Sequence, residues 1–177
     1  GDKEIVISVV DEFGNTHKKS VIVTIKPEQV VGDKLDFDWD EARIYFMLTD
    51  RFKDGDSSNN GGVEYDPTHS EAYHGGDFQG IIDKLDYIED LGINTIWITP
   101  IVDNIDFNKG LDFNTTEGLE AKQYGYHGYW AKDFTTLDEH LGDMKTFQKL
   151  IEKAHDRGIK IMLDVVVNHA GYGMDGE

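Results

Sequence analysis

The sequence predicts an α/β fold in which strands and helices alternate along the chain. Three apolar runs, at residues 43–48, 94–99 and 159–167, are typical of strands buried on both faces of a parallel sheet. Between them, apolar residues recur at helical spacing within residues 81–91 and 144–154, and a glycine able to end a helix lies after each segment. This order favours a parallel sheet whose strands are joined by right-handed helical crossovers.

The alternation by itself leaves an open doubly wound sheet and a closed barrel as alternatives. No Gly-x-Gly-x-x-Gly motif follows the first strand, which argues against a dinucleotide site. Two long loops, residues 49–80 and 100–142, follow the carboxyl ends of the first two strands. In a barrel of eight strand–helix units this end carries the active site, so binding residues are expected in these loops.

The N-terminal region has a different pattern. Apolar residues alternate along residues 5–9 and 21–25, with turn-forming residues at 11–15 between them, which predicts a β-hairpin. Two strands alone are marginally stable in water. We therefore expect residues 1–30 to hold the C-terminal strands of an immunoglobulin-like β-sandwich and the start of a linker, and residues 31–177 to belong to the α/β domain.

The charge and composition exclude several classes of partner. Acidic residues outnumber basic ones by 35 to 17, which gives a net charge of −18. Without a Lys/Arg cluster the chain lacks the positive surface that nucleic acids and anionic membranes attract, and no apolar run is long enough for membrane insertion. Because there is no cysteine, disulfides and thiolate metal sites are ruled out. With 38% hydrophobic residues the chain can still form a core, so we expect a globular protein.

The first long loop is rich in oxygen donors. Calcium takes six to eight oxygen ligands from carboxylates, amides and backbone carbonyls, and a curled loop can supply them from alternate side chains. The oxygen donors lie in two stretches, Asp54-Gly55-Asp56-Ser57-Ser58-Asn59-Asn60 and, about fifteen residues later, Gly75-Gly76-Asp77.

Two alternatives compete with a calcium site at this loop. An EF-hand does not fit, because its sixth position would be Asn59 in place of glycine and its twelfth would be Tyr65 in place of glutamate. An Asx-rich surface turn does fit, with Asp77 acting only as the cap of a helix that begins near Gly80. The residues and their spacing do not decide between a calcium site and an Asx-rich surface turn.

The second long loop carries an aromatic cluster, Tyr124-Gly125-Tyr126-His127-Gly128-Tyr129-Trp130. Sugar rings stack on aromatic faces, and a histidine beside them can bond the hydroxyl groups. The alternative is a buried aromatic corner that only stabilises the fold.

Three polar residues close the third predicted strand: Asp164, Asn168 and His169. Polar residues at this end of a barrel strand are candidates for substrate contacts. His169 could instead be a structural histidine. No His-Glu-x-x-His motif is present, so a multi-histidine metal site is not expected.

Taken in order, these motifs resemble the α-amylase family of glycoside hydrolases, including its cyclodextrin glucanotransferase branch. The resemblance covers residues 43–169. Its motifs are Leu48-Thr49-Asp50-Arg51-Phe52, residues 54–60, Gly75-Gly76-Asp77-Phe78-Gln79-Gly80, residues 126–134 and residues 164–169.

The resemblance implies a role for each candidate residue. Asp54, Asp56, Asn59, Asn60, the carbonyl of Gly75 and Asp77 resemble the ligands of a calcium ion, and Asn168 resembles a ligand of a second calcium. Tyr129 resembles the residue that stacks on the sugar at the cleavage point, with Trp130 in the same substrate-binding group. His127 and His169 resemble donors to sugar hydroxyls. Asp164 resembles a carboxylate that holds the active site together and is not the nucleophile.

The resemblance also implies the fold and the reaction. The expected fold is the N-terminal part of a (β/α)8 barrel, with about three strands and two helices. Retaining hydrolysis needs two carboxyl groups about 5 to 5.5 Å apart. The resemblance places both at later strands, beyond Glu177, so we expect no catalytic residue here and a larger enzyme chain as partner.

The expected activity is cleavage of internal α-1,4 bonds in starch or malto-oligosaccharides by an extracellular enzyme. The alternatives are a glucanotransferase-type transglycosylase and a non-catalytic glycan-binding relative.

Overall fold

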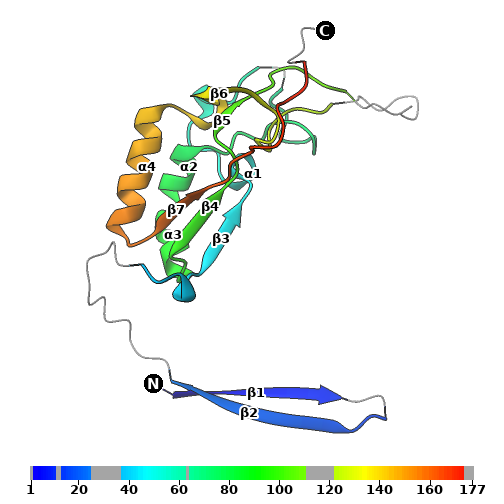
Figure 1. The fold of residues 1–177 in the computed structure, drawn as a ribbon, viewed down its shortest axis with the longest axis vertical. Helices are drawn as coiled ribbons and strands as arrows, with labels where there is room; N and C mark the ends of the chain where they lie inside the picture. Colours follow the sequence, from blue (N-terminus) through cyan, green and yellow to red (C-terminus); the bar gives the residue numbers. More distant parts are fainter. Residues whose placement is uncertain (1, 11–12, 25–36, 63, 111–121, 174–177) are drawn as a thin grey trace. The chain divides into compact units, whose positions relative to one another are not determined.

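A computed structural model describes residues 2–10, 13–24, 37–62, 64–110 and 122–173. The chain divides into two compact units, Gly1–Phe37 and Asp38–Glu177. The first unit holds strands β1 (Asp2–Val10) and β2 (Thr16–Thr24), which pair antiparallel (Figure 1). The predicted hairpin is therefore confirmed. Its assignment to an immunoglobulin-like sandwich stays a prediction.

The second unit is built on a parallel sheet of three strands. Strands β3 (Ile44–Met47), β4 (Thr95–Ile98) and β7 (Lys160–Leu163) lie in the order β3-β4-β7. Both pairs are parallel, as the alternating pattern predicts. The parallel register brings the carboxyl ends of all three strands to one edge of the sheet.

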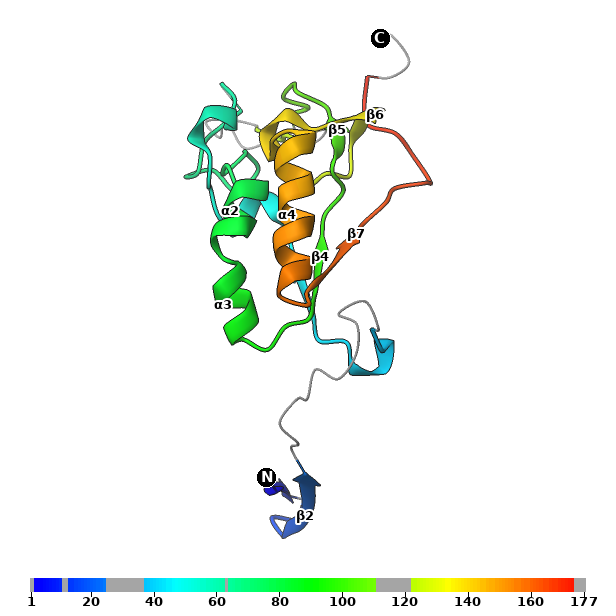
Figure 2. The ribbon, with the colours of Figure 1, turned by 90° about the vertical axis from the view of Figure 1, so that its left-hand side faces the viewer.

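Helices cover one face of this sheet (Figures 1 and 2). They are α2 (Phe78–Asp83), α3 (Leu85–Asp90) and α4 (Met144–Asp156). Burial of their apolar stripes against the strands forms the main core. Its fully buried members include Phe78, Ile81, Leu85, Ile88, Ile96, Ile98 and Leu150.

The ends of the helices follow the predicted signals. Gly92 and Gly158, with φ of +75° and +74°, stand after α3 and α4 and allow the chain to leave the helix in the left-handed conformation. The segment 81–91 is not one continuous helix, however. Lys84, at φ −112° and ψ 9°, separates α2 from α3, because its N–H turns back to the carbonyl of Ile81.

The third strand is shorter than predicted. β7 ends at Leu163, which pairs with Ile98, and the next residue still donates its N–H to Ile98. After Thr99 the neighbouring chain continues with Pro100, which has no N–H to offer a sheet. Beyond residue 164, the apolar run 159–167 therefore has no neighbouring strand to pair with among the described residues.

Large apolar side chains are exposed on the sheet and on the segment that follows β7. Val167 is 92% exposed and Phe46 is 52% exposed, and both belong to the apolar runs that predicted the strands. Contiguous exposed apolar surface usually marks a place where other protein packs. The large apolar side chains exposed on β3, β7 and the segment after β7 are Ile44, Phe46, Leu163, Val165 and Val167.

The loops at the carboxyl edge contain short elements of their own. The first holds α1 (Thr49–Phe52) and the 3-10 helix η2 (Ser57–Asn59). The second holds an antiparallel pair, β5 (Val102–Asn104) and β6 (Ala131–Leu137), followed by the 3-10 helix η3 (Glu139–Leu141). A further 3-10 helix, η1 (Trp39–Glu41), precedes β3. In the part of the chain that the structure describes, no helix has the length and apolar character needed to cross a membrane.

Candidate functional site

The first loop is organised around the carboxylate of Asp77. This side chain is fully buried, and burial raises its pKa. Its Oδ1 accepts N–H groups from Gly55 at 3.2 Å and Gly80 at 2.6 Å, and its Oδ2 accepts from the Asp56 N–H at 2.8 Å and from Asn59 Nδ2 at 3.2 Å. Asp77 is thus the predicted cap of helix α2, and it also holds the loop 55–59 against that helix.

Among the described residues of this loop, two buried amide oxygens have no hydrogen-bond partner. Asn59 donates its Nδ2 to Asp77, and Asn60 donates its Nδ2 to Asp54 Oδ2 at 2.7 Å. Both side-chain oxygens, Asn59 Oδ1 and Asn60 Oδ1, are buried without a hydrogen-bond partner. A buried acceptor left unpaired costs about 1 to 3 kcal/mol. Because calcium prefers neutral and anionic oxygen ligands, this donor set fits a calcium ion.

The structure places the other predicted calcium ligands as follows. Gly75 lies against Asn60, since a Cβ built on Gly75 would fall 2.6 Å from Asn60 Oδ1. Asp56 is exposed, and its Oδ1 accepts from the N–H and hydroxyl of Ser58. Asn168 is exposed on the segment after β7, and its role as a ligand of a second calcium stays a prediction. The described residues hold no group of three or more His, Cys, Asp or Glu side chains suited to a metal.

The aromatic loop and the end of β7 meet at the carboxyl edge of the sheet. The hydroxyl of Tyr129 donates to Asp164 Oδ2 at 2.8 Å, although the two residues are 35 positions apart. Burial and the Asp164 carboxylate raise the pKa of Tyr129 to about 12, which keeps the hydroxyl protonated as a donor. The exposed His169 donates Nε2–H to the Tyr129 carbonyl at 3.0 Å, since a carbonyl can only accept.

His127 lies within the aromatic cluster and is neutral at physiological pH. Burial, and secondarily the positive charge of Arg51, lower its pKa to about 4. Its Nδ1 accepts the N–H of Tyr129 at 3.0 Å, so the proton of the neutral ring is on Nε2. His127 is therefore set to act as a donor through Nε2. Its ring is stacked beside Tyr129, with centroids 5.7 Å apart and planes at 24°.

Trp130 completes the aromatic group. Its ring is T-shaped to the rings of His127 and Tyr172, with centroids 4.5 Å and 5.1 Å apart. Its backbone N–H donates to Asn104 Oδ1 at 2.8 Å, which ties the loop to β5. Tyr129 and Trp130 are only half-buried, so aromatic surface remains available to a ligand.

The neutral state of His127 gives a prediction for pH dependence. Between about pH 6.5 and pH 4 the unfolded histidine binds a proton that the folded one does not, so stability falls as the pH falls through this range. We expect His127→Gln to remove this loss, which is at most about 3 kcal/mol. Urea unfolding of both proteins across the range checks it. Parallel stability curves for the variant and the unsubstituted protein would contradict the assignment.

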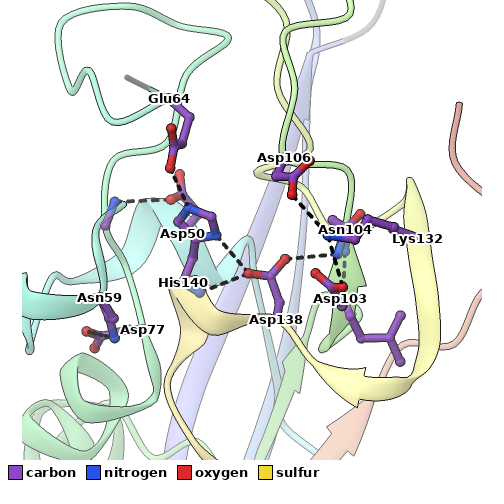
Figure 3. Close-up of polar contacts among 12 residues, drawn as sticks. Asp50, Asn59, Glu64, Asp77, Asp103, Asn104, Asp106, Lys132, Asp138 and His140 are labelled. Carbon is purple, nitrogen blue, oxygen red and sulfur yellow. Dashed lines mark hydrogen bonds and ion pairs between the residues drawn. The ribbon is translucent and has the colours of Figure 1, made fainter. Parts of the chain in front are cut away.

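A buried polar network around His140 contains residues that no sequence pattern indicated (Figure 3). His140 is stacked on Tyr73, and its Nδ1 lies 2.9 Å from Asp138 Oδ1 and its Nε2 3.4 Å from Glu64 Oε1. Burial lowers the pKa of His140, but the two carboxylates outweigh it and raise the pKa above its ordinary value. Asp138 Oδ2 also accepts the N–H of Asn104 at 3.2 Å. The network thus joins the first loop to the β5–β6 pair.

A second residue without a predicted role is Asp50, in α1, although it stands in the family motif Leu48-Thr49-Asp50-Arg51-Phe52. It is buried at 2% exposure and accepts the N–H groups of His74 and Gly75. A single carboxylate or histidine in a loop has no periodic signal, so neither Asp50 nor the network around His140 could be found from spacing alone. The place of Asp50 in that motif, shortly after the predicted first strand, is the sequence signal it offers.

Comparison with known proteins supports a relation to carbohydrate-active enzymes. The family model described as the catalytic domain of α-amylase matches residues 46–176. A beta/alpha-amylase of Paenibacillus polymyxa is 45% identical over 139 residues, which cover 77% of this chain and 10% of that protein. The periplasmic α-amylase of Escherichia coli is 42% identical over 139 residues, which cover 77% of this chain and 20% of that protein.

Transglycosylases and solved structures match as well. The cyclomaltodextrin glucanotransferase of Klebsiella oxytoca is 41% identical over 145 residues, which cover 79% of this chain and 21% of that protein. The crystal structure of an Anoxybacillus α-amylase superimposes with a TM-score of 0.64 at 44% identity, over 77% of this chain and 26% of that one. The matched region thus spans about a tenth to a quarter of each of these proteins.

Proposed function

The chain belongs to the α-amylase catalytic-domain family of glycoside hydrolases, and on that premise we propose that it is part of a calcium-stabilised, retaining enzyme that cleaves internal α-1,4-glucosidic bonds of starch-like polysaccharides. The observation that carries the proposal is the pairing of Tyr129 with Asp164 at the carboxyl edge of the sheet. An aromatic face, a carboxylate and a neutral histidine donor at one edge are what a glucose unit requires.

Each of these side chains has a distinct task in this proposal. The ring of Tyr129 stacks on the sugar at the cleavage point, with Trp130 beside it. His127 donates Nε2–H to a sugar hydroxyl. Asp164 orients Tyr129 through the hydroxyl bond and accepts from the substrate. His169 donates Nε2–H to the Tyr129 carbonyl, so in this proposal its Nδ1 accepts from a sugar hydroxyl, in place of the donor role that the resemblance implies.

The bond-breaking groups of the proposed enzyme are outside this sequence. A retaining mechanism uses one carboxylate as nucleophile and a second carboxyl group as acid and then base. The family resemblance assigns both to later strands of a (β/α)8 barrel, of which β3, β4 and β7 would be the first three. The exposed apolar side chains of Phe46 on β3 and Leu163 on β7 support the packing of further strands and helices on this sheet.

Calcium is proposed at the first loop. Asp54, Asp56, Asn59, Asn60, the Gly75 carbonyl and Asp77 would hold the ion, and the unpaired Asn59 and Asn60 oxygens support this. Bound there, calcium supplies a cross-link between the loop after β3 and the start of α2, without a part in the chemistry. Its effect is on stability and on the shape of the carboxyl edge.

We also propose that the enzyme acts outside the cell, either secreted or on the cell surface. A starch polymer outside a cell cannot cross its membrane, so an enzyme that uses such a polymer must cleave it outside. One relative, from Escherichia coli, is named as periplasmic. Fractionation of the source organism with an antibody against this chain tests the location, and retention in the cytoplasm would refute it.

Product analysis tests the proposed activity. The full-length protein is incubated with amylose, and its products are separated by chromatography. We expect short linear malto-oligosaccharides whose new reducing ends are first formed in the α configuration, as NMR can detect. First products in the β configuration would refute a retaining mechanism.

A second candidate is favoured by the match to a cyclomaltodextrin glucanotransferase. In a retaining enzyme the same covalent intermediate can pass to water or to another sugar. Dominant cyclic or elongated glucans in the product analysis would establish transfer in place of hydrolysis. Binding of amylose without any product would indicate a non-catalytic glycan-binding relative.

A further inference from the structure

Asp50 holds the part of the calcium loop that carries Gly75. It lies in α1, directly after β3, and is 2% exposed. Its Oδ1 accepts the N–H of His74 at 2.9 Å and the N–H of Gly75 at 3.1 Å, and its Oδ2 is 3.0 Å from the His74 nitrogen. One buried carboxylate therefore fixes two successive peptide units 24 and 25 residues further along the chain.

The backbone of Asp50 fixes the next peptide unit. The N–H of Gly76 donates to the Asp50 carbonyl at 2.8 Å. In a planar trans peptide the N–H and the preceding C=O point in opposite directions. The carbonyl of Gly75 must therefore point away from Asp50. Both peptide units that meet at the Gly75 Cα are thus held by the same residue, one through its side chain and one through its backbone.

Gly75 has little freedom to move from this position. Its φ of +85° is in the left-handed region, which a side chain would strain. A Cβ at Gly75 would lie 2.6 Å from Asn60 Oδ1, one of the two unpaired buried oxygens. Gly75, the proposed carbonyl ligand, is therefore packed against Asn60, a proposed amide-oxygen ligand.

Arg51 also holds the Asp50 carboxylate in place. Its guanidinium forms an ion pair with Asp50 and donates to the Ser70 carbonyl at 2.6 Å. It also lies over the ring of Tyr126, 3.8 Å from the centroid. Burial raises the pKa of Asp50 above its ordinary value and outweighs the opposing effects of the bonds from His74 and Gly75 and of the Arg51 charge.

We propose that Asp50, which is not among the proposed ligands, is a positioning residue that sets the calcium affinity of the loop by holding the two peptide units that meet at Gly75 and with them the Gly75 carbonyl. The inference rests on the calcium site of the proposed function and adds a residue to it. Groups that orient the ligands of a metal typically contribute 10- to 100-fold to its affinity. The Asp50 carboxylate would also add negative charge near a cation held by the loop, without being one of its proposed ligands.

The test is calcium binding measured by titration calorimetry on the full-length protein. Asp50→Asn keeps the size of the side chain but presents an NH2 group toward at least one of the two N–H donors. We expect its calcium Kd to rise by about 10- to 100-fold. Asp50→Glu keeps the charge but displaces it, and a smaller rise is expected.

Asp138→Asn is the matched control. It also replaces a buried carboxylate that accepts backbone N–H groups, but its partners are His140 and Asn104. We expect a lower melting temperature with an unchanged calcium Kd. Equal weakening in both variants, or an unchanged Kd in Asp50→Asn, would overturn the inference. If the unsubstituted protein binds no calcium, the site itself fails and the inference with it.

A second measurement needs no variant. Amide exchange of the unsubstituted protein in excess chelator reports on His74 and Gly75 by NMR. Slow exchange of both amides is expected, because Asp50 holds them before calcium arrives. Rapid exchange of both would show that Asp50 does not organise the loop, even if Asp50→Asn cannot be folded.

Discussion

Asp77→Ala is expected to remove most of the stabilisation that calcium gives to the protein. Asp77 is both a proposed ligand and the acceptor of four N–H groups in a fully buried position. At a free calcium concentration about a hundred times Kd, binding would add about 2.7 kcal/mol to the free energy of unfolding. Without the Asp77 carboxylate, the loop 55–59 loses its hydrogen bonds to residue 77. The unpaired oxygens of Asn59 and Asn60 are then no longer held in place to bind one ion.

The variant also loses stability that does not depend on calcium. Removing a helix cap costs about 1 kcal/mol, and the N–H groups left buried without a partner raise the total to about 3 kcal/mol or more. Scanning calorimetry in calcium and in excess chelator separates the two effects. The unsubstituted protein should melt lower in chelator, and the variant should melt at nearly the same temperature in both.

Asp143→Ala provides the matched control for Asp77. Asp143 caps helix α4 by accepting the N–H of Thr146 at 2.7 Å, but it is exposed and outside the first loop. Its loss should lower the melting temperature by the cost of a cap alone, with the full effect of chelator retained. An equal loss of the chelator effect in both variants would mean that the effect reports general stability and not a site at Asp77.

Tyr129→Ala is expected to lower kcat/KM of the full-length enzyme on amylose by about 30-fold or more. Loss of an aromatic anchor typically costs at least about 2 kcal/mol of binding free energy, and about 1.4 kcal/mol corresponds to a factor of ten. The variant removes the stacking surface and also leaves the Asp164 carboxylate without its hydroxyl donor. Steady-state kinetics give kcat and KM separately.

Tyr129→Phe divides the two contributions. It keeps the ring and removes only the 2.8 Å bond to Asp164, for which we expect a loss of about tenfold. If the hydroxyl bond orients Asp164 in the transition state, Tyr129→Phe lowers kcat. The loss of stacking in Tyr129→Ala, where it acts in the ground state, raises KM.

Tyr87→Ala is the control for the tyrosine series, because Tyr87 is half-exposed on α3 and outside the aromatic cluster. We expect an unchanged kcat/KM. A Tyr129→Ala enzyme that is also unaffected would exclude Tyr129 from the sugar site.

The elements that the sequence predicted well are those whose signal repeats over several turns or strand positions. The helix at Met144–Asp156 follows from its apolar stripe, and the hairpin of β1 and β2 follows from alternation on both sides of a turn. The β5–β6 pair was missed because β5 is only three residues long and has no period to detect. The break at Lys84 was missed because the apolar spacing runs through it unchanged.

The sequence by itself determined the parallel α/β order, the residues of both loops and the family resemblance that named their roles. Only the tertiary structure decided which of those residues meet: Tyr129 with Asp164, Asp77 with the loop 55–59, and Asp50 with Gly75. The physical reason is the range of each signal. Periodicity acts between neighbours a few residues apart, whereas these contacts depend on the parallel register that brings distant strand ends, and the loops that follow them, to one edge of the sheet.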